Sequence, residues 1–203
     1  MKLYYAPGTC AVAPWIVAEW AGVDYEVEKA KLGTDDYTKI NPLGSVPALV
    51  LNDGQVITQA TAIMNYIAKQ NPSADLLSSG SDVDDAKLAE ILSFLASDFH
   101  AAFWPVFGPQ KITTSQEEQD FEPIREAAYK RIDRVLTNLD RLIGDGEHVY
   151  KNKRTLADAY AYVMTQWSKK TPKDFTNYPN VKRFMEAMDK DEAVQKVMAE
   201  SVK

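Results

Sequence analysis

The stretch NPLGSVPALVLNDGQVITQATAIMNYIAKQ, residues 41–70, contains the signals that decide the fold of the first third of the chain. Two short apolar runs, PALVL and QVIT, flank the tripeptide NDG at 52–54, which has the turn chemistry of a tight antiparallel hairpin. The segment that follows predicts a helix, because Ile63, Met64 and Ile67 recur on one helical face. We therefore expect two strands and then a helix.

The residues before this stretch alternate strand and helix signals. KLYY at 2–5 predicts a short strand, and APGT at 6–9 supplies a turn. CAVAPWIVAEWAG at 10–22 predicts a helix that stops at Gly22, and DYEVEKA at 24–30 predicts a half-buried strand. The order β-α-β-(α)-β-β-α indicates a small α/β domain with a mixed sheet.

The rest of the chain predicts helices only. A segment rich in Ser, Asp and Pro at 71–85 is typical of a linker. Beyond it, apolar residues recur at steps of three and four between Ile124 and Leu142, and TLADAY at 155–160 has the form of a helix-opening capping box. We predict an α/β domain over 1–72, a linker over 73–86 and an all-α domain over 87–203.

Composition restricts the function. The chain has 203 residues and a net charge of −6, which argues against a nucleic-acid partner that needs a basic face. It has no apolar run long enough for a membrane span, no basic-then-apolar signal peptide, and a single cysteine, so no intramolecular disulfide forms. With two histidines and no ligand spacing, a metal site is not expected. We expect a cytoplasmic globular protein.

The single cysteine, Cys10, stands between the predicted turn and helix. A thiol at a helix N-terminus faces unpaired N–H groups and the positive end of the dipole, which favour the reactive thiolate. The alternative is a buried cysteine acting as a small apolar residue. The strand–turn–Cys–helix setting favours the functional interpretation.

Two other short motifs each allow a functional and a structural interpretation. A cis bond at Val46-Pro47 would present the Val46 backbone to a ligand as an added strand does, whereas a trans proline at a sheet edge is the commoner case. The N–H groups at the strand-to-helix change around Gln59 and Ala60 suit a carboxylate, whereas an ordinary N-cap at Thr58 or Thr61 is the alternative.

The histidines have different settings. His100 lies in DFHAAFWPVF at 98–107, among aromatic residues, and by itself fits a histidine of the helical core. His148, in GDGEHVYKNK at 145–154, is expected at the surface. No P-loop and no Gly-x-Gly-x-x-Gly occurs in the sequence.

Taken together, these motifs resemble the glutathione S-transferases, and among them the bacterial beta class. The resemblance is carried by KLYYAPGTC, NPLGSVPAL, ITQATAIMNYIA, DFHAAFWPVF, and TLADAY with the later Trp167, and so it spans nearly the whole chain. It implies a thioredoxin-like first domain that binds glutathione, a helical second domain, a homodimer, and glutathione as co-substrate without a metal.

The resemblance also implies roles for single residues. Cys10 corresponds to a cysteine beside the glutathione sulfur that can form a mixed disulfide with it. His100 corresponds to a histidine that approaches this sulfur from the helical domain, and Trp167 to a tryptophan that lines the same cleft.

Five further positions match the family's glutathione site. Val46 would pair its backbone with the cysteinyl part of glutathione, with Pro47 in the cis form. Gln59 and Ala60 would hold the γ-glutamyl carboxylate, and Tyr5 matches a tyrosine near the site.

At four positions the chain departs from the family pattern. Ala11 stands where a serine is frequent, Ala60 where a hydroxyl is frequent, Ala101 where a lysine commonly follows the histidine, and Ser93 where an asparagine is expected from the neighbouring subunit. Each departure removes about one hydrogen bond, roughly 0.5–1.5 kcal/mol.

The leading hypothesis is therefore an enzyme that conjugates glutathione to small apolar electrophiles. The electrophile would bind a pocket formed by Phe103, Trp104 and Phe107, together with Trp167. An accessory thiol–disulfide exchange through Cys10 is a second form of the same hypothesis. The four departures motivate one alternative, a non-catalytic transferase-like module that binds a protein partner.

Overall fold

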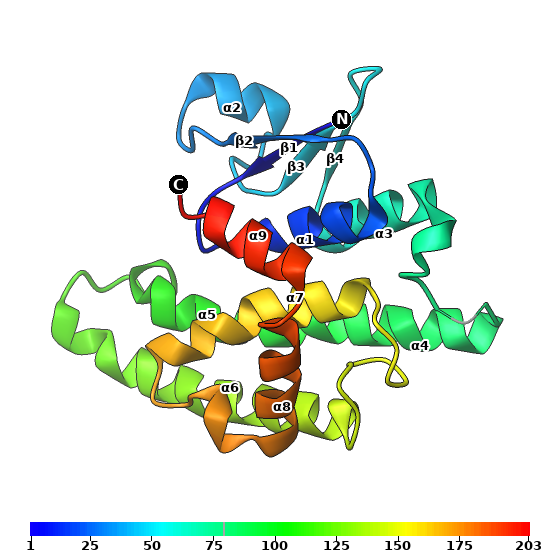
Figure 1. The fold of residues 1–203 in the computed structure, drawn as a ribbon. Helices are drawn as coiled ribbons and strands as arrows, with labels where there is room; N and C mark the ends of the chain where they lie inside the picture. The colour runs from blue at the N-terminus through cyan, green and yellow to red at the C-terminus, as the bar shows by residue number, and fades with distance from the viewer. Residues whose placement is uncertain (79) are drawn as a thin grey trace.

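The computed structural model describes residues 1–78 and 80–203 and divides the chain into a sheet-containing half and a helical half (Figure 1). The elements of the first half are β1 (Lys2–Tyr5), α1 (Val12–Ala21), β2 (Glu26–Lys29), α2 (Asp35–Ile40), β3 (Ala48–Val50), β4 (Val56–Thr58) and α3 (Ala60–Gln70), followed by the 3₁₀ turn η1 (Pro72–Ala74).

The helical half follows in the same chain order. Its longer helices are α4 (Asp82–Ser93), α5 (His100–Phe107), α6 (Glu122–Ile143), α7 (Leu156–Thr165), α8 (Pro179–Met188) and α9 (Glu192–Glu200). Its short elements are the π-helix η2 (Phe94–Phe99) and the 3₁₀ segments η3 (Pro109–Lys111), η4 (Glu118–Asp120), η5 (Gln166–Lys170) and η6 (Phe175–Asn177).

The sheet is mixed, as the sequence predicts, with the strand order β2-β1-β3-β4. β1 pairs in parallel with β2 and antiparallel with β3, and β3 pairs antiparallel with β4 through the predicted hairpin. β2 is an edge strand in which only Val27 is half-buried, so it is more exposed than its alternating sequence predicts.

Helix α1 lies between the sheet and the helical half and is buried along most of its length (Figure 1). It contacts α3 on its own side and α7 and α9 on the other. Gly22 ends it in the left-handed conformation, with φ 60°, as the sequence predicts. Packing on two sides explains why α1 is apolar on all faces rather than on one stripe.

The segment predicted as a linker over 73–86 is partly structured, and one of its residues, Ser79, lies outside the described part. Leu76 is buried, and its carbonyl accepts a hydrogen bond of 3.0 Å from the N–H of Leu156. α4 already begins at Asp82, because the hydroxyl of Ser81 caps the N–H of Asp84 and carboxylates fill the first turn. The helical half therefore starts earlier than the predicted boundary.

Helix α7 is the centre of the helical half, and all ten of its residues are buried. The capping box predicted at its start is present between Thr155 and Asp158. Asp158 also accepts a hydrogen bond of 2.8 Å from the N–H of Val149. This buried carboxylate therefore fixes both the first turn of α7 and the loop before it.

A cluster around Asp191 joins the two halves away from the cleft. The indole N–H of Trp20, on α1, donates to the Asp191 carboxylate at 3.0 Å, and the Arg154 guanidinium pairs with the same carboxylate at 3.2 Å. Arg154 also lies over the Trp20 ring, and Asp191 caps the N–H of Val194 in α9. One carboxylate thus ties α1, α9 and the loop before α7 together.

The π-helix η2 interrupts what would otherwise be one continuous helix from α4 to α5. At its end the N–H of His100 donates to the carbonyl of Leu95, five residues back. This inserts one extra residue into a turn, which changes the side of the helix that the following residues present. Among the described residues, no helix has both the length and the apolar character that crossing a bilayer requires.

Candidate functional site

A cavity of about 800 Å³ lies between the two halves, in the size range of small-molecule sites. It is lined by Gly8, Thr9, Cys10, Leu32, Gly44, Ser45, Val46, Pro47, Gln59, Ala60, Ala96, His100, Trp104, Phe107, Lys111, Tyr160, Trp167 and Lys170. Nine of the eleven site residues predicted from the sequence are in this set. The fold thus gathers residues spread over most of the chain around one cavity.

The other two predicted residues, Tyr5, expected near the site, and Phe103, expected in the pocket wall, lie behind the residues that line the cavity. Tyr5 ends β1 with its side chain buried against the ring of Trp15, 5.0 Å away between centroids. Phe103 has no exposed surface and packs on Phe107 and Trp167. The cavity instead receives residues 100, 104 and 107, which share one face of α5, whereas residues 99 and 103 face the core.

Cys10 opens to the cavity but is 8% exposed, and its thiol lies 3.8 Å from the Val46 carbonyl. Burial raises the pKa of the Cys10 thiol to about 11, and its own backbone N–H opposes this only in part. The sequence predicts that the helix start favours the thiolate form of Cys10. In the structure burial outweighs this effect and favours the thiol. At neutral pH the group is a thiol.

The first N–H groups of α1 explain this difference. The N–H of Ala11 is bound by the Thr9 hydroxyl at 3.3 Å, that of Val12 by the Thr9 carbonyl, and that of Ala13 by the Cys10 carbonyl. Pro14, the next residue, has no N–H. Apart from the N–H of Cys10 itself, the donors that would stabilise a thiolate are therefore occupied or missing, and desolvation decides the pKa.

The loop before β3 presents backbone groups to the cavity. The Val46-Pro47 peptide bond is cis, as the resemblance implies and against the commoner trans alternative. The carbonyl of Ser45 accepts hydrogen bonds from the Tyr37 hydroxyl at 2.8 Å and from the Asn41 amide at 2.6 Å. These two bonds fix the backbone next to Val46 independently of any ligand.

Helix α3 begins at the cavity with an unusual cap. Its N-cap is Gln59, with φ 70°, and not Thr58 or Thr61 as the structural alternative expected. No side chain caps the first turn, and Gln59 and Ala60 both line the cavity. The first N–H groups of a helix have no partner within it, so this end of α3 can accept a carboxylate.

His100 faces the cavity and is held by aromatic neighbours rather than by a charge. Its Nδ1 lies 3.1 Å from the Tyr160 hydroxyl, and its ring packs on Trp167 and Trp104 at 5.0 and 5.7 Å. Burial lowers the pKa of His100 to about 4, so the ring is neutral at physiological pH. A neutral imidazole can accept a proton at one nitrogen and donate one from the other.

Tyr160 is a site residue that the sequence reasoning missed. It is the tyrosine of TLADAY, on α7, and it both lines the cavity and contacts His100. Burial raises the pKa of its phenol, and the proximity of Cys10 adds to the shift, so the hydroxyl keeps its proton. It lies five residues after Thr155, on a helix that packs against α1 and against the π-helix η2.

Trp167 closes the cavity on the helical side. Its indole N–H donates to the carbonyl of Gly8 at 2.9 Å, which joins the end of α7 to the turn before α1. Its ring meets the ring of Phe107 at 5.7 Å, while Trp104 and Phe107 remain about half exposed. The helical half thus supplies an aromatic wall opposite the backbone groups of the first half.

Two lysines at this wall, Lys111 and Lys170, were also missed. No group of His, Cys, Asp or Glu side chains that could hold a metal ion occurs within residues 1–78 and 80–203. His148, expected at the surface, is half-buried with its Nδ1 3.6 Å from the Asp158 carboxylate, and this contact raises the pKa of His148.

The four departures from the family pattern occupy different places. Ala60 lines the cavity, whereas Ala11 is fully buried beneath it. Ala101, next to His100, and Ser93, on α4, do not line it. Only one of the four therefore removes a side-chain group from the cavity wall of this chain.

Comparisons with known proteins agree with this architecture. Residues 1–69 match the model of the glutathione S-transferase N-terminal domain, and residues 97–201 match a model of the C-terminal domain. The chain is 32% identical to glutathione S-transferase GST-4.5 of Xanthomonas campestris, over 96% of each chain.

Solved structures give the same result. A sphingomonad glutathione S-transferase complexed with glutathione superimposes with a TM-score of 0.87 at 32% identity, over 100% of this chain and 99% of that one. The beta-class enzyme of Sphingomonas chungbukensis gives 0.87 at 32% identity, over 99% and 98%. Two matched domains, nearly full-length relatives and a cleft with the expected elements agree: the chain belongs to the glutathione S-transferase family and is similar to its bacterial beta class.

Proposed function

We propose that the cavity binds glutathione and conjugates its thiol to small apolar electrophiles. The observation that carries the proposal is the meeting of Val46, Gln59 and His100 around one cavity of about 800 Å³. It combines a strand-like backbone, an uncapped helix start and a neutral imidazole. A tripeptide needs a backbone edge to pair with its peptide groups, N–H donors for its terminal carboxylate, and a hydrogen-bond donor for its thiolate.

In this proposal the first half of the chain binds the peptide. The exposed backbone of Val46, held by the fixed loop before β3, pairs with the cysteinyl unit of glutathione. The γ-glutamyl carboxylate lies at the start of α3, where Gln59 and the N–H of Ala60 donate to it. This arrangement directs the glutathione sulfur toward Cys10 and His100.

His100 and Tyr160 then stabilise the reacting sulfur. The Tyr160 phenol keeps its proton, and in this proposal it donates to Nδ1, so that the imidazole carries its own proton on Nε2. The Nε2–H donates to the glutathione thiolate and lowers its pKa, while the thiol proton passes to water. The sulfur attacks the electrophilic carbon, a C–S bond forms, and the leaving group departs with its electron pair.

Thiol–disulfide exchange through Cys10 is a second candidate function, favoured by the opening of its sulfur to the cavity. The Cys10 thiolate would attack the glutathione sulfur of a mixed disulfide between glutathione and another thiol, form a Cys10–glutathione disulfide and release the other thiol as thiolate; a glutathione thiolate would then release glutathione disulfide and regenerate Cys10. Since the pKa of Cys10 is about 11, we expect this exchange to be slow at neutral pH.

Calorimetric titration with glutathione, on the reduced protein and on Cys10→Ala, tests the proposal. We expect saturable binding by both proteins, and conjugation of 1-chloro-2,4-dinitrobenzene by both, with exchange lost in the variant. Equal loss of conjugation and exchange in Cys10→Ala would contradict the roles given to Cys10 and His100. If neither protein binds glutathione, the non-catalytic interaction module replaces the enzyme.

We also propose that the protein is a cytoplasmic homodimer. The relatives that support the family assignment and the single reduced cysteine, Cys10, motivate this. Light scattering behind size-exclusion chromatography measures the molar mass directly, and a value near the chain mass of 22.7 kDa would overturn the dimer.

A further inference from the structure

Two lysines stand at the aromatic end of the cavity. Lys111 ends η3, directly after α5, and Lys170 ends η5, directly after α7. Both side chains are exposed and both line the cavity. Neither position is used by the proposed glutathione site, which lies along the backbone of Val46 and the start of α3.

Each lysine follows one member of an aromatic pair along the chain. The rings of Phe107 and Trp167 meet at 5.7 Å and join the ends of α5 and α7. Lys111 follows Phe107 by four residues, and Lys170 follows Trp167 by three. Leu32, 48% exposed, lines the cavity from the first half.

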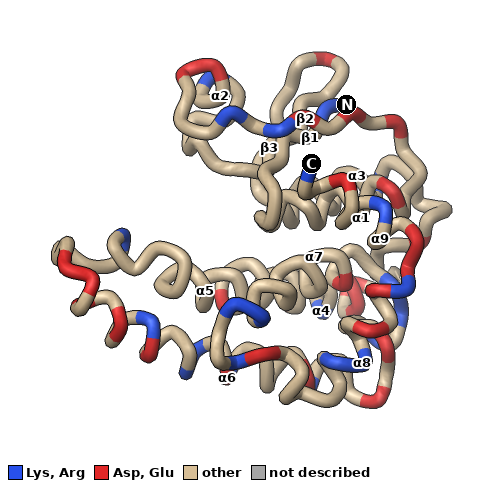
Figure 2. The backbone as a smooth tube through the Cα atoms, turned by 60° about the vertical axis from the view of Figure 1, so that its left-hand side comes forward, with Lys and Arg blue, Asp and Glu red and all other residues tan. Residues whose placement is uncertain are grey.

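The cavity wall around these lysines carries positive but no negative side chains. The residues that line the cavity include no Asp or Glu, although the chain as a whole carries a net charge of −6. Within the described part of the chain, no salt bridge joins the ammonium of Lys111 or Lys170 to a carboxylate, whereas the nearby Lys173 pairs with Asp133 at 3.4 Å. Figure 2 shows a short blue stretch at the outer end of α5, next to the red stretch that leads into α6.

An aromatic wall with two ammonium groups that no carboxylate pairs with fits a particular ligand. An aromatic ring would pack on Trp104 and Phe107, and an acidic substituent on that ring would reach the lysines. Ammonium groups attract carboxylate, sulfonate and phosphate alike, as point charges on flexible stems. A neutral apolar ring would use the wall but leave both charges unpaired.

We propose that Lys111 and Lys170 form an anion subsite, and that the preferred second substrates are aromatic electrophiles that carry an acidic group. This inference rests on the proposed function, because it names the substrate class of the same cleft. The other source of an anion there is the glycyl carboxylate of glutathione itself. The experiment below separates these two sources.

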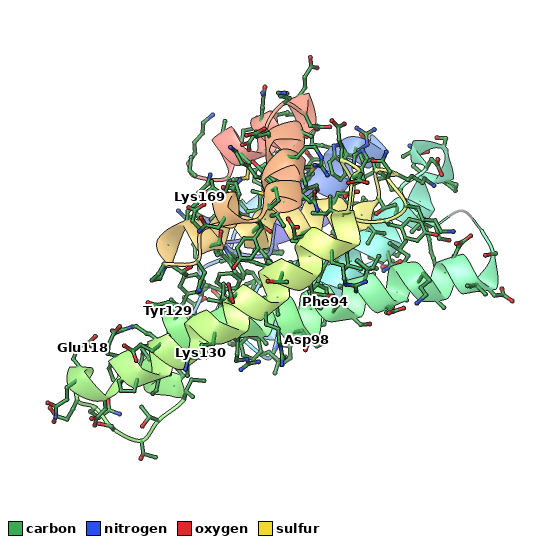
Figure 3. All side chains as sticks on the ribbon, turned by 90° about the horizontal axis from the view of Figure 1, so that it is seen from below. Phe94, Asp98, Glu118, Tyr129, Lys130 and Lys169 are labelled. Atoms are coloured by element: carbon green, nitrogen blue, oxygen red, sulfur yellow. The ribbon has the colours of Figure 1, made fainter. Side chains whose placement is uncertain are left out.

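Two electrophiles with the same ring and leaving group provide the test: 4-chloro-3,5-dinitrobenzoate and its uncharged amide. For each, kcat/KM is divided by the rate constant of the uncatalysed reaction with glutathione thiolate, which removes the difference in intrinsic reactivity. We compare the wild type with Lys111→Met, Lys170→Met and the double variant. The control is Lys130→Met, an exposed lysine of α6 on the side of the molecule that faces away from the sheet (Figure 3).

We expect the wild type to prefer the benzoate. An exposed ion pair contributes up to about 1 kcal/mol, which is about a fivefold effect. Each single variant should therefore lower the preference about threefold and the double variant about tenfold, with Lys130→Met unchanged. Raising the ionic strength from 0.02 to 0.5 M should weaken the preference of the wild type in the same direction.

A second readout does not depend on turnover. Unreactive 3,5-dinitrobenzoate and 3,5-dinitrobenzamide should quench the fluorescence of Trp104 and Trp167, with tighter binding of the acid that the double variant loses. If this difference is found but neither electrophile is conjugated, the subsite stands and the proposed function fails.

Two other results overturn the subsite. One is equal binding and equal corrected turnover of acid and amide by the wild type. The other is a rise in the KM for glutathione that is the same with both electrophiles in the lysine variants, because the lysines would then hold the glycyl carboxylate.

Discussion

The single cysteine provides a direct test of which physical effect controls the site. A thiol at the start of a helix is commonly expected to be a thiolate, but here burial outweighs the helix end. Raising the pKa of Cys10 from 9.0 to about 11 lowers the thiolate fraction at pH 7 about a hundredfold, to roughly 10⁻⁴. The predicted consequence is a thiol that alkylates slowly and only at high pH.

The assay is the rate of iodoacetamide alkylation between pH 6 and 10, followed by mass spectrometry of the intact protein. Because Cys10 is the only cysteine, each modified molecule reports on one site, and Cys10→Ser corrects for reaction elsewhere. The rate should rise about tenfold per pH unit with no plateau below pH 10. The same chain in urea should show a midpoint near the ordinary value of 9.0.

Slow entry of iodoacetamide into the cleft would lower the alkylation rate at every pH. It would not change the shape of the pH–rate profile. A plateau reached below pH 8.5 in the folded protein would contradict the dominance of burial over the helix end. It would mean that N–H donors at the start of α1 reach the sulfur, although Thr9 and Cys10 carbonyls hold those of Val12 and Ala13.

The same shift has a consequence for stability, with a definite sign. The Cys10 thiol loses its proton near pH 9.0 in the unfolded chain and near pH 11 in the folded one. The contribution of the protonated thiol to the free energy of unfolding is therefore fully present below pH 9. It is lost as the pH rises through the folded value. Urea unfolding of the wild type relative to Cys10→Ser should therefore show a decrease of up to about 2.7 kcal/mol across that window.

Three further substitutions test other parts of the structure. Tyr160→Phe removes the hydroxyl next to His100 and should lower kcat about threefold to tenfold with little change in glutathione affinity, as steady-state kinetics would show; a pure rise in KM would contradict the positioning role. Trp20→Phe loses the bond to Asp191 and should cost about 1–2 kcal/mol in urea unfolding, whereas no change would mean that the cluster contributes nothing. His148 has a raised pKa, so its stabilisation is present below about pH 6.5 and lost as the pH rises above its folded value; His148→Gln should flatten this dependence in unfolding curves at pH 6 and 8.

Much of the fold was predictable because its signals are local. The NDG turn, the stop at Gly22 and the capping box at Thr155 each act within a few residues, and the structure contains all three. The linker was predicted less well, because Ser and Asp residues occur both in loops and in helix first turns. Ser81 uses its hydroxyl as a cap, so the helix extends into the segment that composition assigned to the linker.

The parts of the site that were missed depend on contacts between distant segments. Phe103 belongs to the aromatic run that the sequence predicts in the pocket, but the π-helix before His100 sets which side of α5 faces the cavity. Tyr160 enters the site because α7 packs against α1 and against the π-helix before His100. Lys111 and Lys170 become neighbours of the same wall only when Phe107 meets Trp167.

The two walls of the cleft also explain why departures from the family pattern need not disable it. The first half offers mainly backbone groups, from Val46 and from the start of α3, and these survive any change of side chain. Ala60 removes a hydroxyl from this wall but keeps its N–H, so the loss is about one hydrogen bond, roughly 0.5–1.5 kcal/mol. The helical half, by contrast, acts through side chains, and its aromatic and charged residues are where this chain can differ from its relatives. In the proposed function, the backbone groups that hold the peptide lie on the first wall, whereas the side chains that select the second substrate lie on the helical wall, from which His100 and Tyr160 also act on the glutathione sulfur.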